Sequence, residues 1–264
     1  MRVLVTGPRG FVGARIMDVL PDAIPAPSLR DADEASVKRM VETVRPDVIV
    51  HTAAISDVSA CEADPEASWH ANVLLPVWLA QTGVRLIAFS TDQVYGGCES
   101  EGPYREDMAV PANMYARHKL AMEERTLEAS AQTVLLRATW MYDMPRYGVS
   151  NRGNFLMNML LARSLAFSSS QHRAVTYVRE VAGHIREAMA LPGGVYNYGS
   201  ENDATMMETA RWLKRELSLS VELREAEKRH SLWMDGTKAR DSGIVFRNTR
   251  DGLKQCIADY GLCV

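Results

Sequence analysis

The sequence has few cysteines, no close grouping of metal-ligating side chains and no long apolar run. Its four cysteines, Cys61, Cys98, Cys256 and Cys263, are scattered through 264 residues, a pattern that favours free thiols over a disulfide framework. The six histidines lack the short spacing typical of metal ligands, so we expect no structural metal site. No stretch approaches the roughly 20 apolar residues that a membrane span needs. The sequence therefore predicts no disulfide framework, no metal-stabilised fold and no membrane protein.

The charge gives no reason to expect a nucleic-acid or membrane-surface partner. The formal net charge is −3 at pH 7, and 24% of the residues are charged. Such a balance attracts neither phosphate backbones nor anionic lipids. The first residues lead directly into a strand pattern, from which we expect no signal peptide. These features predict a soluble, cytoplasmic protein, long enough for one large domain or for a domain with a smaller appendage.

Glycine is concentrated at the N-terminus, where residues 1–13 read MRVLVTGPRGFVG. Val3–Val5 form a short apolar run typical of a strand buried on both faces. Gly7, Gly10 and Gly13 follow it, and a helical pattern begins after Gly10. Such a turn lets backbone N–H groups approach a pyrophosphate at the positive end of a helix dipole. An ordinary strand-to-helix turn also carries glycines, but the preceding strand and the N-terminal position favour a dinucleotide site.

Strand and helix patterns alternate along the first half of the chain, which predicts an α/β fold with a doubly wound parallel sheet of the Rossmann type. We expect buried strands at residues 3–5, 47–51, 84–89, 133–137 and 195–198, and helices at residues 33–44, 65–82, 155–165, 181–191, 206–217 and 252–260, with one more ending near residue 128. Residues 21–27 contain three prolines and suit either a surface linker or an abbreviated second strand. The regularity changes after Trp140. We therefore expect a dinucleotide-binding domain over residues 1–142 and a mainly substrate-binding lobe over residues 143–264, with part of the later chain returning to the first domain.

Two polar groups suited to proton transfer lie on one predicted helix. Tyr115 and Lys119 are four residues apart and therefore share a helix face. A tyrosine with its usual pKa of about 10 is a proton donor at neutral pH, and a neighbouring ammonium is expected to lower that pKa. A surface Tyr–Lys pair would look the same. The strand before this helix ends in Ser90 and Thr91, however, at the sheet edge where ligands bind. Three polar groups that converge on one oxygen beside a dinucleotide indicate carbonyl reduction by hydride transfer.

These motifs resemble those of the extended short-chain dehydrogenase/reductase superfamily, and more narrowly those of dTDP-4-dehydrorhamnose reductases and related sugar-nucleotide-binding proteins. The likeness rests on TGPRGFVG, STDQVYGG and YARHK in that order, and it continues through RPDVIV at residues 45–50, LRATW at residues 136–140 and GNF at residues 153–155. The glycine motif occurs in many families, whereas the STD segment followed by YxxxK is far more specific. The resemblance spans nearly the whole chain.

The resemblance implies a catalytic set of Thr91, Tyr115 and Lys119. Tyr115 would give a proton to a keto oxygen, Lys119 would hold the nicotinamide ribose, and Thr91 would orient the carbonyl group. Together with the glycine turn it implies a cofactor-binding set of Gly7, Arg9, Gly10, Phe11, Val12, Gly13, Arg30, Asp31, Ala53, Ala54, Ile55 and Phe89, besides Tyr115 and Lys119. The implied substrate-binding set is Thr91, Asp92, Tyr115, Trp140, Gln171 and Arg173. Core packing is the alternative for Trp140, and a solvated loop position is the alternative for Arg173.

The cofactor is predicted to be NADP(H), with NAD(H) as the alternative. Arg9 precedes the second glycine and can reach a 2′-phosphate, and a basic residue there favours NADP(H) in the superfamily. The short second strand also ends without the acidic residue that would bind a 2′-hydroxyl of NAD. Asp31 and Asp33 lie about twenty residues after the glycines, which favours NAD(H).

We therefore hypothesise an NADP(H)-dependent reductase whose substrate is a small-molecule keto-sugar nucleotide, with no nucleic acid, membrane or metal as partner. Two alternatives stay open. One is a sugar-nucleotide epimerase or dehydratase that regenerates its cofactor, and the other is a non-catalytic binding subunit similar to the regulatory partner of methionine adenosyltransferase. The resemblance also implies a homodimer through the helices that include Tyr115.

Overall fold

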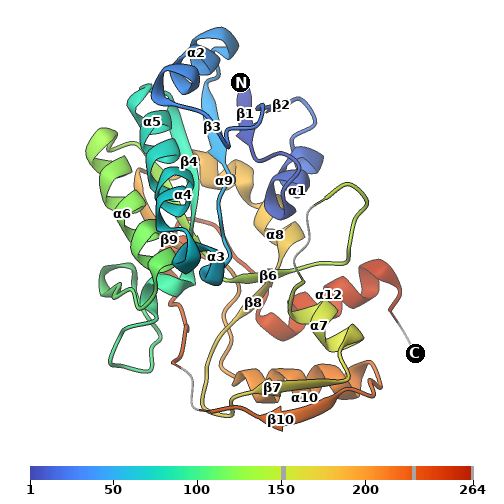
Figure 1. Cartoon of the computed structure of the whole chain (residues 1–264). Helices are drawn as coiled ribbons and strands as arrows, with labels where there is room; N and C mark the ends of the chain where they lie inside the picture. The colour runs from blue at the N-terminus through green and yellow to red at the C-terminus, as the bar shows by residue number, and fades with distance from the viewer. Residues whose placement is uncertain (150–152, 228–229, 263–264) are drawn as a thin grey trace.

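A six-stranded parallel sheet forms the centre of the molecule (Figure 1). The computed structural model describes residues 1–149, 153–227 and 230–262. The sheet strands are β1 (Val3–Thr6), β2 (Ile24–Pro25), β3 (Val48–His51), β4 (Arg85–Thr91), β5 (Val134–Ala138) and β9 (Gly194–Tyr198), in the spatial order β2-β1-β3-β4-β5-β9. The fold class predicted from the sequence is confirmed.

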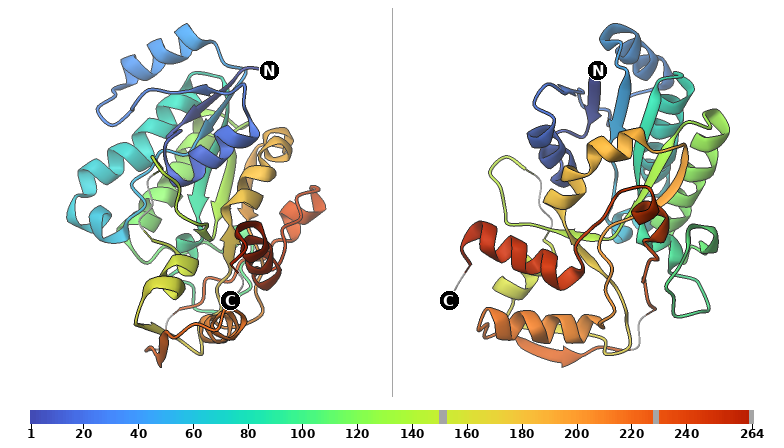
Figure 2. Two further views of the ribbon diagram at one scale, coloured as in Figure 1. Left: turned by 90° about the vertical axis from the view of Figure 1, so that its right-hand side faces the viewer. Right: turned by 180° about the vertical axis from the view of Figure 1, so that it is seen from behind.

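Helices cover both faces of the sheet because its strands carry apolar side chains on both sides. In β3, Val48 and Val50 face one layer of helices, whereas Ile49 faces the other. The first layer is α1 (Phe11–Val19), α8 (Val178–Gly183) and α9 (Ile185–Ala190), and the second is α2 (Glu34–Val44), α5 (Leu75–Gln81) and α6 (Met114–Ala129). The two views of Figure 2 show these layers on opposite sides of the strands.

The succession of strands changes direction between β1 and β3. From β1 the chain moves outward to β2, then returns past β1 to β3 and continues toward β4 and β5. Loops that leave two such neighbouring strands diverge and open a crevice at the carboxyl edge of the sheet, where ligands bind in α/β proteins. The fold therefore places a ligand site at the loops after β1 and β3, beside the end of β4.

A smaller lobe lies beyond the carboxyl edge of the sheet (Figure 1). It holds two pairs of parallel strands, β6 (Trp140–Tyr142) with β8 (Val175–Tyr177) and β7 (Ser164–Phe167) with β10 (Glu222–Glu225), and the helices α7 (Phe155–Leu161), α10 (Met206–Glu216) and α12 (Thr249–Tyr260). The lobe has its own apolar core, in which the side chains of Tyr142, Phe155 and Leu253 are fully buried. The chain returns to the sheet after β8 through α8, α9 and β9, and again after β10 through α11 (Thr237–Asp241), whose Ala239 packs in the core of the sheet.

Three predicted helices differ from the structure. The helix expected at residues 155–165 ends at Leu161, because residues 164–167 form strand β7. Leu165 and Phe167 pack on the lobe core whereas Ser164 and Ala166 are exposed, and this period of two suits a strand. The helix expected at residues 181–191 is in fact the two helices α8 and α9, which meet at His184. The last helix begins at Thr249 rather than at residue 252.

The structure adds detail to the predictions for two other segments, residues 65–82 and residues 21–27. Residues 65–82 are helical, but a π-helical turn (His70–Leu74) separates α4 (Pro65–Trp69) from α5. Of the two interpretations of residues 21–27, the abbreviated strand is correct, since Ile24 and Pro25 pair in parallel with β1. A proline is tolerated there because β2 is an edge strand.

Five short elements of six residues or fewer were not predicted from the sequence: the helices α3 (Val58–Ala63) and α11, and the strands β6, β8 and β10. No helix within the described ranges is long and apolar enough to cross a membrane. Cys61, Cys98 and Cys256 are buried free thiols, as expected, and Cys263 lies outside the described residues.

Candidate active site

The glycine turn after β1 is shaped by close approaches that only glycine permits. Gly7 has a φ of 64°, and a Cβ atom there would lie 2.9 Å from the Ala53 nitrogen. A Cβ atom on Gly13 would lie 2.1 Å from the Gly7 carbonyl oxygen, so α1 packs directly on the turn. Gly10 is the N-cap of α1 and supplies no side chain to its first N–H groups. The turn therefore leaves the positive end of a nine-residue helix open to an anion.

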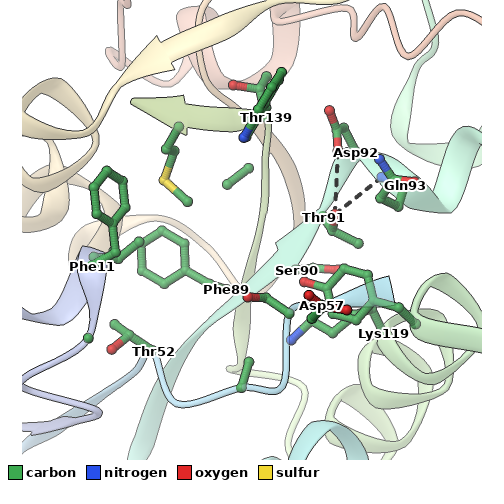
Figure 3. Close-up of a pocket in the computed structure, with 18 of the residues that line it drawn as sticks. Phe11, Thr52, Asp57, Phe89, Ser90, Thr91, Asp92, Gln93, Lys119 and Thr139 are labelled. Atoms are coloured by element: carbon green, nitrogen blue, oxygen red, sulfur yellow. Dashed lines mark hydrogen bonds between the residues drawn. The ribbon is translucent and has the colours of Figure 1, made fainter. Parts of the chain in front are cut away.

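A cavity of about 450 Å³ opens at the switch point of the sheet. Its wall includes part of the glycine turn, the loop after β3, the ends of β4 and β5, and α6 (Figure 3). Phe11 and Phe89 line one side of the cavity in this view, and Thr91, Asp92 and Gln93 line the other. The predicted residues that line it are Gly10, Phe11, Val12, Ala53, Ala54, Phe89, Thr91, Asp92, Tyr115, Lys119, Trp140 and Arg173.

Helix α6 carries Tyr115 and Lys119 into this cavity. Asn113 caps the helix, since its side chain accepts a hydrogen bond from the Ala116 N–H at 2.8 Å. Tyr115 is therefore in the first helical turn and Lys119 is one turn later on the same face. Both are buried, with 8% and 2% of their surface exposed. Their burial contradicts the surface-pair alternative.

Burial dominates the proton affinity of both groups. It raises the pKa of Tyr115 above its usual value, although a hydrogen bond with Thr91 acts in the opposite direction. The expected lowering of this pKa is therefore wrong as the net result, because the loss of hydration of the phenolate is the largest effect. Burial also lowers the pKa of Lys119 to about 8, against an opposing effect of Glu123. At neutral pH the pair thus holds a protonated phenol beside an ammonium that is close to losing its proton.

At the far side of the cavity, the buried Asp92 forms an ion pair with the half-buried Arg173. Nε and Nη2 of Arg173 donate to the two Asp92 carboxylate oxygens at 3.0 and 3.2 Å. Burial raises the pKa of Asp92, and Arg173 opposes this rise. The Arg173 guanidinium also lies 5.5 Å from the centre of the Trp140 ring. Trp140 is half-buried at the cavity wall, and Arg173 is not the solvated loop charge that was its alternative.

A buried polar network connects α6 to strands β4, β5 and β9. Glu123 accepts hydrogen bonds from Arg137 Nη2 at 2.6 Å and from the Ser90 hydroxyl at 2.5 Å. Arg137 also donates to the Tyr95 hydroxyl, which donates to Asn197 of β9. This network was not predicted from the sequence. Glu123, four residues after Lys119, was a detectable sign of a polar contact on that helix face. Its partner Arg137 was not, because the other residues of β5 are all apolar.

Several predicted residues do not line the cavity. Gly7 and Gly13 shape the glycine turn but are not part of the cavity wall. Arg9, Arg30 and Asp31 are exposed and are not part of the wall either. Ile55 is held in the loop after β3 by the Asn72 side chain, which bonds both its N–H and its carbonyl oxygen. The Gln171 amide donates to the His230 carbonyl oxygen. The cavity wall also includes Thr52, Ser56, Asp57, Thr139 and Met141, which the sequence analysis did not select.

These residues fit a dinucleotide. The cradle would be filled by any Cβ atom at Gly7 or Gly13, and the open N-terminus of α1 suits a pyrophosphate. Ala53 and Ala54 leave room for a flat ring between the turn and β4. Lys119 and Tyr115 would then face the reacting end of the dinucleotide. Asp92 and Arg173 would face the molecule that reacts with it.

Comparison with known proteins agrees with this geometry. Residues 1–261 match the family model described as the RmlD substrate binding domain. The spore coat polysaccharide biosynthesis protein SpsK of Bacillus subtilis is 25% identical over 232 residues, which cover 83% of this chain and 81% of SpsK. A dTDP-4-dehydrorhamnose reductase of Burkholderia thailandensis is 32% identical over 205 residues, which cover 72% of this chain and 66% of that protein. The solved dTDP-4-dehydrorhamnose reductase of Bacillus anthracis, in complex with NADP, has a TM-score of 0.84 at 20% identity and covers 98% of this chain and 99% of its own. At that identity the structural likeness shows the shared fold.

Proposed function

The chain belongs to the RmlD substrate binding domain family, and on this premise we propose that it is an NADP(H)-dependent reductase of a keto-sugar nucleotide, similar to dTDP-4-dehydrorhamnose reductase. The observation that carries the proposal is the burial of Tyr115 and Lys119 on one helix face, opposite Thr91 and beside the glycine cradle. The family match extends over the whole site, from the glycine turn to Arg173.

The chain's own residues divide the work of carbonyl reduction. NADPH, when bound, supplies the hydride that goes to the carbonyl carbon, and becomes NADP⁺. Tyr115 donates the phenolic proton to the carbonyl oxygen, and its raised pKa keeps that proton in place until negative charge develops there. The Thr91 hydroxyl orients the same oxygen. The Lys119 ammonium binds the cofactor's ribose and stabilises the phenolate left on Tyr115.

The far side of the cavity suits the sugar nucleotide. We propose that Trp140 and Asp92 contact the sugar. We also propose that Arg173, held in place by Asp92, donates its remaining guanidinium N–H groups to the diphosphate. Gln171 is not part of the cavity wall, so its proposed contact requires the substrate to extend toward the loop before β8. A homodimer and a cytoplasmic location also stay predictions from the resemblance and the sequence.

The pH dependence of the reaction tests the role of Lys119. Because burial lowers its pKa to about 8, the ammonium predominates below that pH and is lost above it. We expect kcat/KM for NADPH to fall by about tenfold per pH unit as pH rises beyond 8. Lys119→Arg keeps its charge throughout and should lack this decline, although its rate is lower. A wild-type profile that is flat to pH 10 would exclude the ammonium from cofactor binding.

Arg9 tests the choice of cofactor. It is exposed in the glycine turn, and we propose that it contacts the 2′-phosphate of NADPH. We expect Arg9→Ala to weaken NADPH binding by about tenfold and to leave NADH binding nearly unchanged, because only NADPH carries the phosphate. Isothermal titration calorimetry with each cofactor measures this. Arg39→Ala, which removes an exposed arginine of α2, is the matched control, and equal losses for both cofactors would remove Arg9 from the phosphate role.

The proposed activity is tested by incubating the protein with NADPH and a panel of 4-keto and 3-keto sugar nucleotides, and following the absorbance of NADPH. A reductase consumes stoichiometric NADPH and forms a hydroxy sugar. Conversion of a sugar nucleotide without net NADPH consumption would identify an epimerase or dehydratase instead. Binding of NADPH with no conversion of any substrate, together with a stoichiometric enzyme partner, would identify a non-catalytic subunit.

A further inference from the structure

Arg15 is a buried arginine in the second turn of α1. Its side chain is only 5% exposed, and it points back along the helix toward the glycine turn. Nη1 donates to the Phe11 carbonyl oxygen at 3.3 Å, and the guanidinium carbon lies 4.7 Å from the centre of the Phe11 ring. Phe11 is the first residue of α1 and lines the cavity. Arg15 therefore contacts both the carbonyl group and the ring of the first residue of α1.

The charge of Arg15 is balanced by Asp143, 128 residues later. Arg15 Nε and Nη2 each lie 3.0 Å from Asp143 Oδ2, and Nη2 also donates to the Met144 carbonyl oxygen at 3.1 Å. The Asp143 side chain is 1% exposed. A buried pair of this kind persists only with good geometry and further hydrogen bonds.

Asp143 supplies those further bonds from the substrate-side lobe. Its Oδ1 accepts from the Tyr260 hydroxyl of α12 at 2.8 Å, and its carbonyl oxygen accepts from the Asn154 side chain at 2.8 Å. Asn154 is in turn the N-cap of α7. Asp143 directly follows β6, whose Trp140 and Met141 line the cavity. Asp143 thus connects α1 to α12 through its carboxylate, to the N-cap of α7 through its backbone carbonyl oxygen, and to β6 through the chain itself.

The two ends of this connection meet at the same cavity. Figures 1 and 2 show residues 143–149, which follow β6, running alongside α1. Phe11 lines the cavity on the cofactor side, and Trp140 lines it on the lobe side. Arg179 of α8 is a second cation near Asp143, with its Nε 3.8 Å from Asp143 Oδ2, but its side chain is 50% exposed, so Arg15 is the buried partner of this carboxylate.

We propose that Arg15 and Asp143 are positioning residues that fix the N-terminal turn of α1, which faces the cofactor, against the lobe that holds the substrate. The proposal rests on the proposed function. Neither Arg15 nor Asp143 is among the residues that line the cavity. The pair acts through Phe11 and the N-terminus of α1 on one side and through β6 on the other, and it sets the distance between the two bound molecules. Hydride transfer depends steeply on that distance, since a misplacement of about 1 Å can cost about a hundredfold in rate.

The chain contains a matched control pair. Asp18 and Arg146 join the same helix to the same segment, but their side chains are 49% and 48% exposed. An exposed pair is screened by solvent and holds its partners weakly. If tethering of this segment to α1 were enough, removal of either pair would have the same effect.

The experiment compares Arg15→Met, Asp143→Asn, their double variant and Asp18→Asn/Arg146→Met with the parent protein. Thermal unfolding is measured first, and assays are run at a temperature at which each variant is folded. The double variant leaves no unpaired buried charge, and Arg15→Lys retains the charge should Arg15→Met fail to fold. Calorimetry gives the Kd of NADPH, and steady-state kinetics give kcat at saturating cofactor and substrate.

We expect the Kd of NADPH to rise by about tenfold and kcat to fall by about 10- to 100-fold in each single variant, with no larger loss in the double variant, because the pair acts as a unit. Arg15→Lys should recover part of kcat, and the exposed-pair control should match the parent. A lower unfolding temperature with parental Kd and kcat would overturn the proposal, because the pair would then be only structural. Absence of turnover in the parent would contradict the proposed function alone, since the NADPH affinities would still decide the role of the pair.

Discussion

Tyr115→Phe is expected to lower the kcat of keto-sugar-nucleotide reduction by about 10²- to 10⁴-fold while NADPH affinity changes little. The substitution removes the only proposed proton donor to the carbonyl oxygen, and general acid catalysis contributes about this factor. Phenylalanine fills the same buried space on α6, so the cavity and the cofactor cradle keep their shape. Single-turnover reduction measured with NADPH prebound separates the chemical step from binding.

The matched control for this variant is Tyr142→Phe. Tyr142 is also a buried tyrosine, and no hydrogen-bond partner of its hydroxyl is found among the described residues. Removal of that hydroxyl should therefore leave kcat close to the parental value. Parental turnover in Tyr115→Phe would exclude Tyr115 as the proton donor and shift the role to another group at the cavity.

Glu123→Gln should lower the free energy of unfolding by about 3–5 kcal/mol. Glu123 and Arg137 are each 3% exposed, and removal of one charge leaves the other buried without its partner. Ser90 and Arg137 would both lose a strong acceptor. The effect is measured by urea unfolding monitored by circular dichroism.

Glu124→Gln, at the exposed neighbouring position of α6, provides the control and should change stability little. The double variant Glu123→Gln/Arg137→Met should lose less stability than the sum of its two single variants, because no unpaired charge remains. A loss in Glu123→Gln no greater than that in Glu124→Gln would show that the buried pair contributes nothing net to stability.

The central fold was predictable because its strands are buried on both faces and therefore read as apolar runs. Val3–Val5 and residues 133–137 are of this kind, and each was placed to within a residue or two. The lobe gave a weaker signal. Strands β6 and β8 have three residues each, too few to show a period, and the alternation in β7 was hidden by the apolar run of α7 before it.

The candidate site was predictable where its residues follow one another closely. Tyr115 and Lys119 are one helical turn apart, and Thr91 ends a strand that Asp92 directly follows. The pairs that position these residues were not predictable. Arg137 is 14 residues from Glu123, Arg173 is 81 residues from Asp92, and Asp143 is 128 residues from Arg15. Such partners are set by tertiary packing, which leaves no local periodicity to detect.

The repeated passage of the chain between the sheet and the lobe has an evolutionary consequence. Because β9 completes the sheet after β8 and before α10, the lobe is not one contiguous stretch of sequence. A single recombination event near residue 142 would import a foreign β9, and with it a new neighbour for β5 and a new partner for the Tyr95 hydroxyl. Exchange of the lobe while the sheet is kept intact would therefore require junctions on both sides of β9, not one.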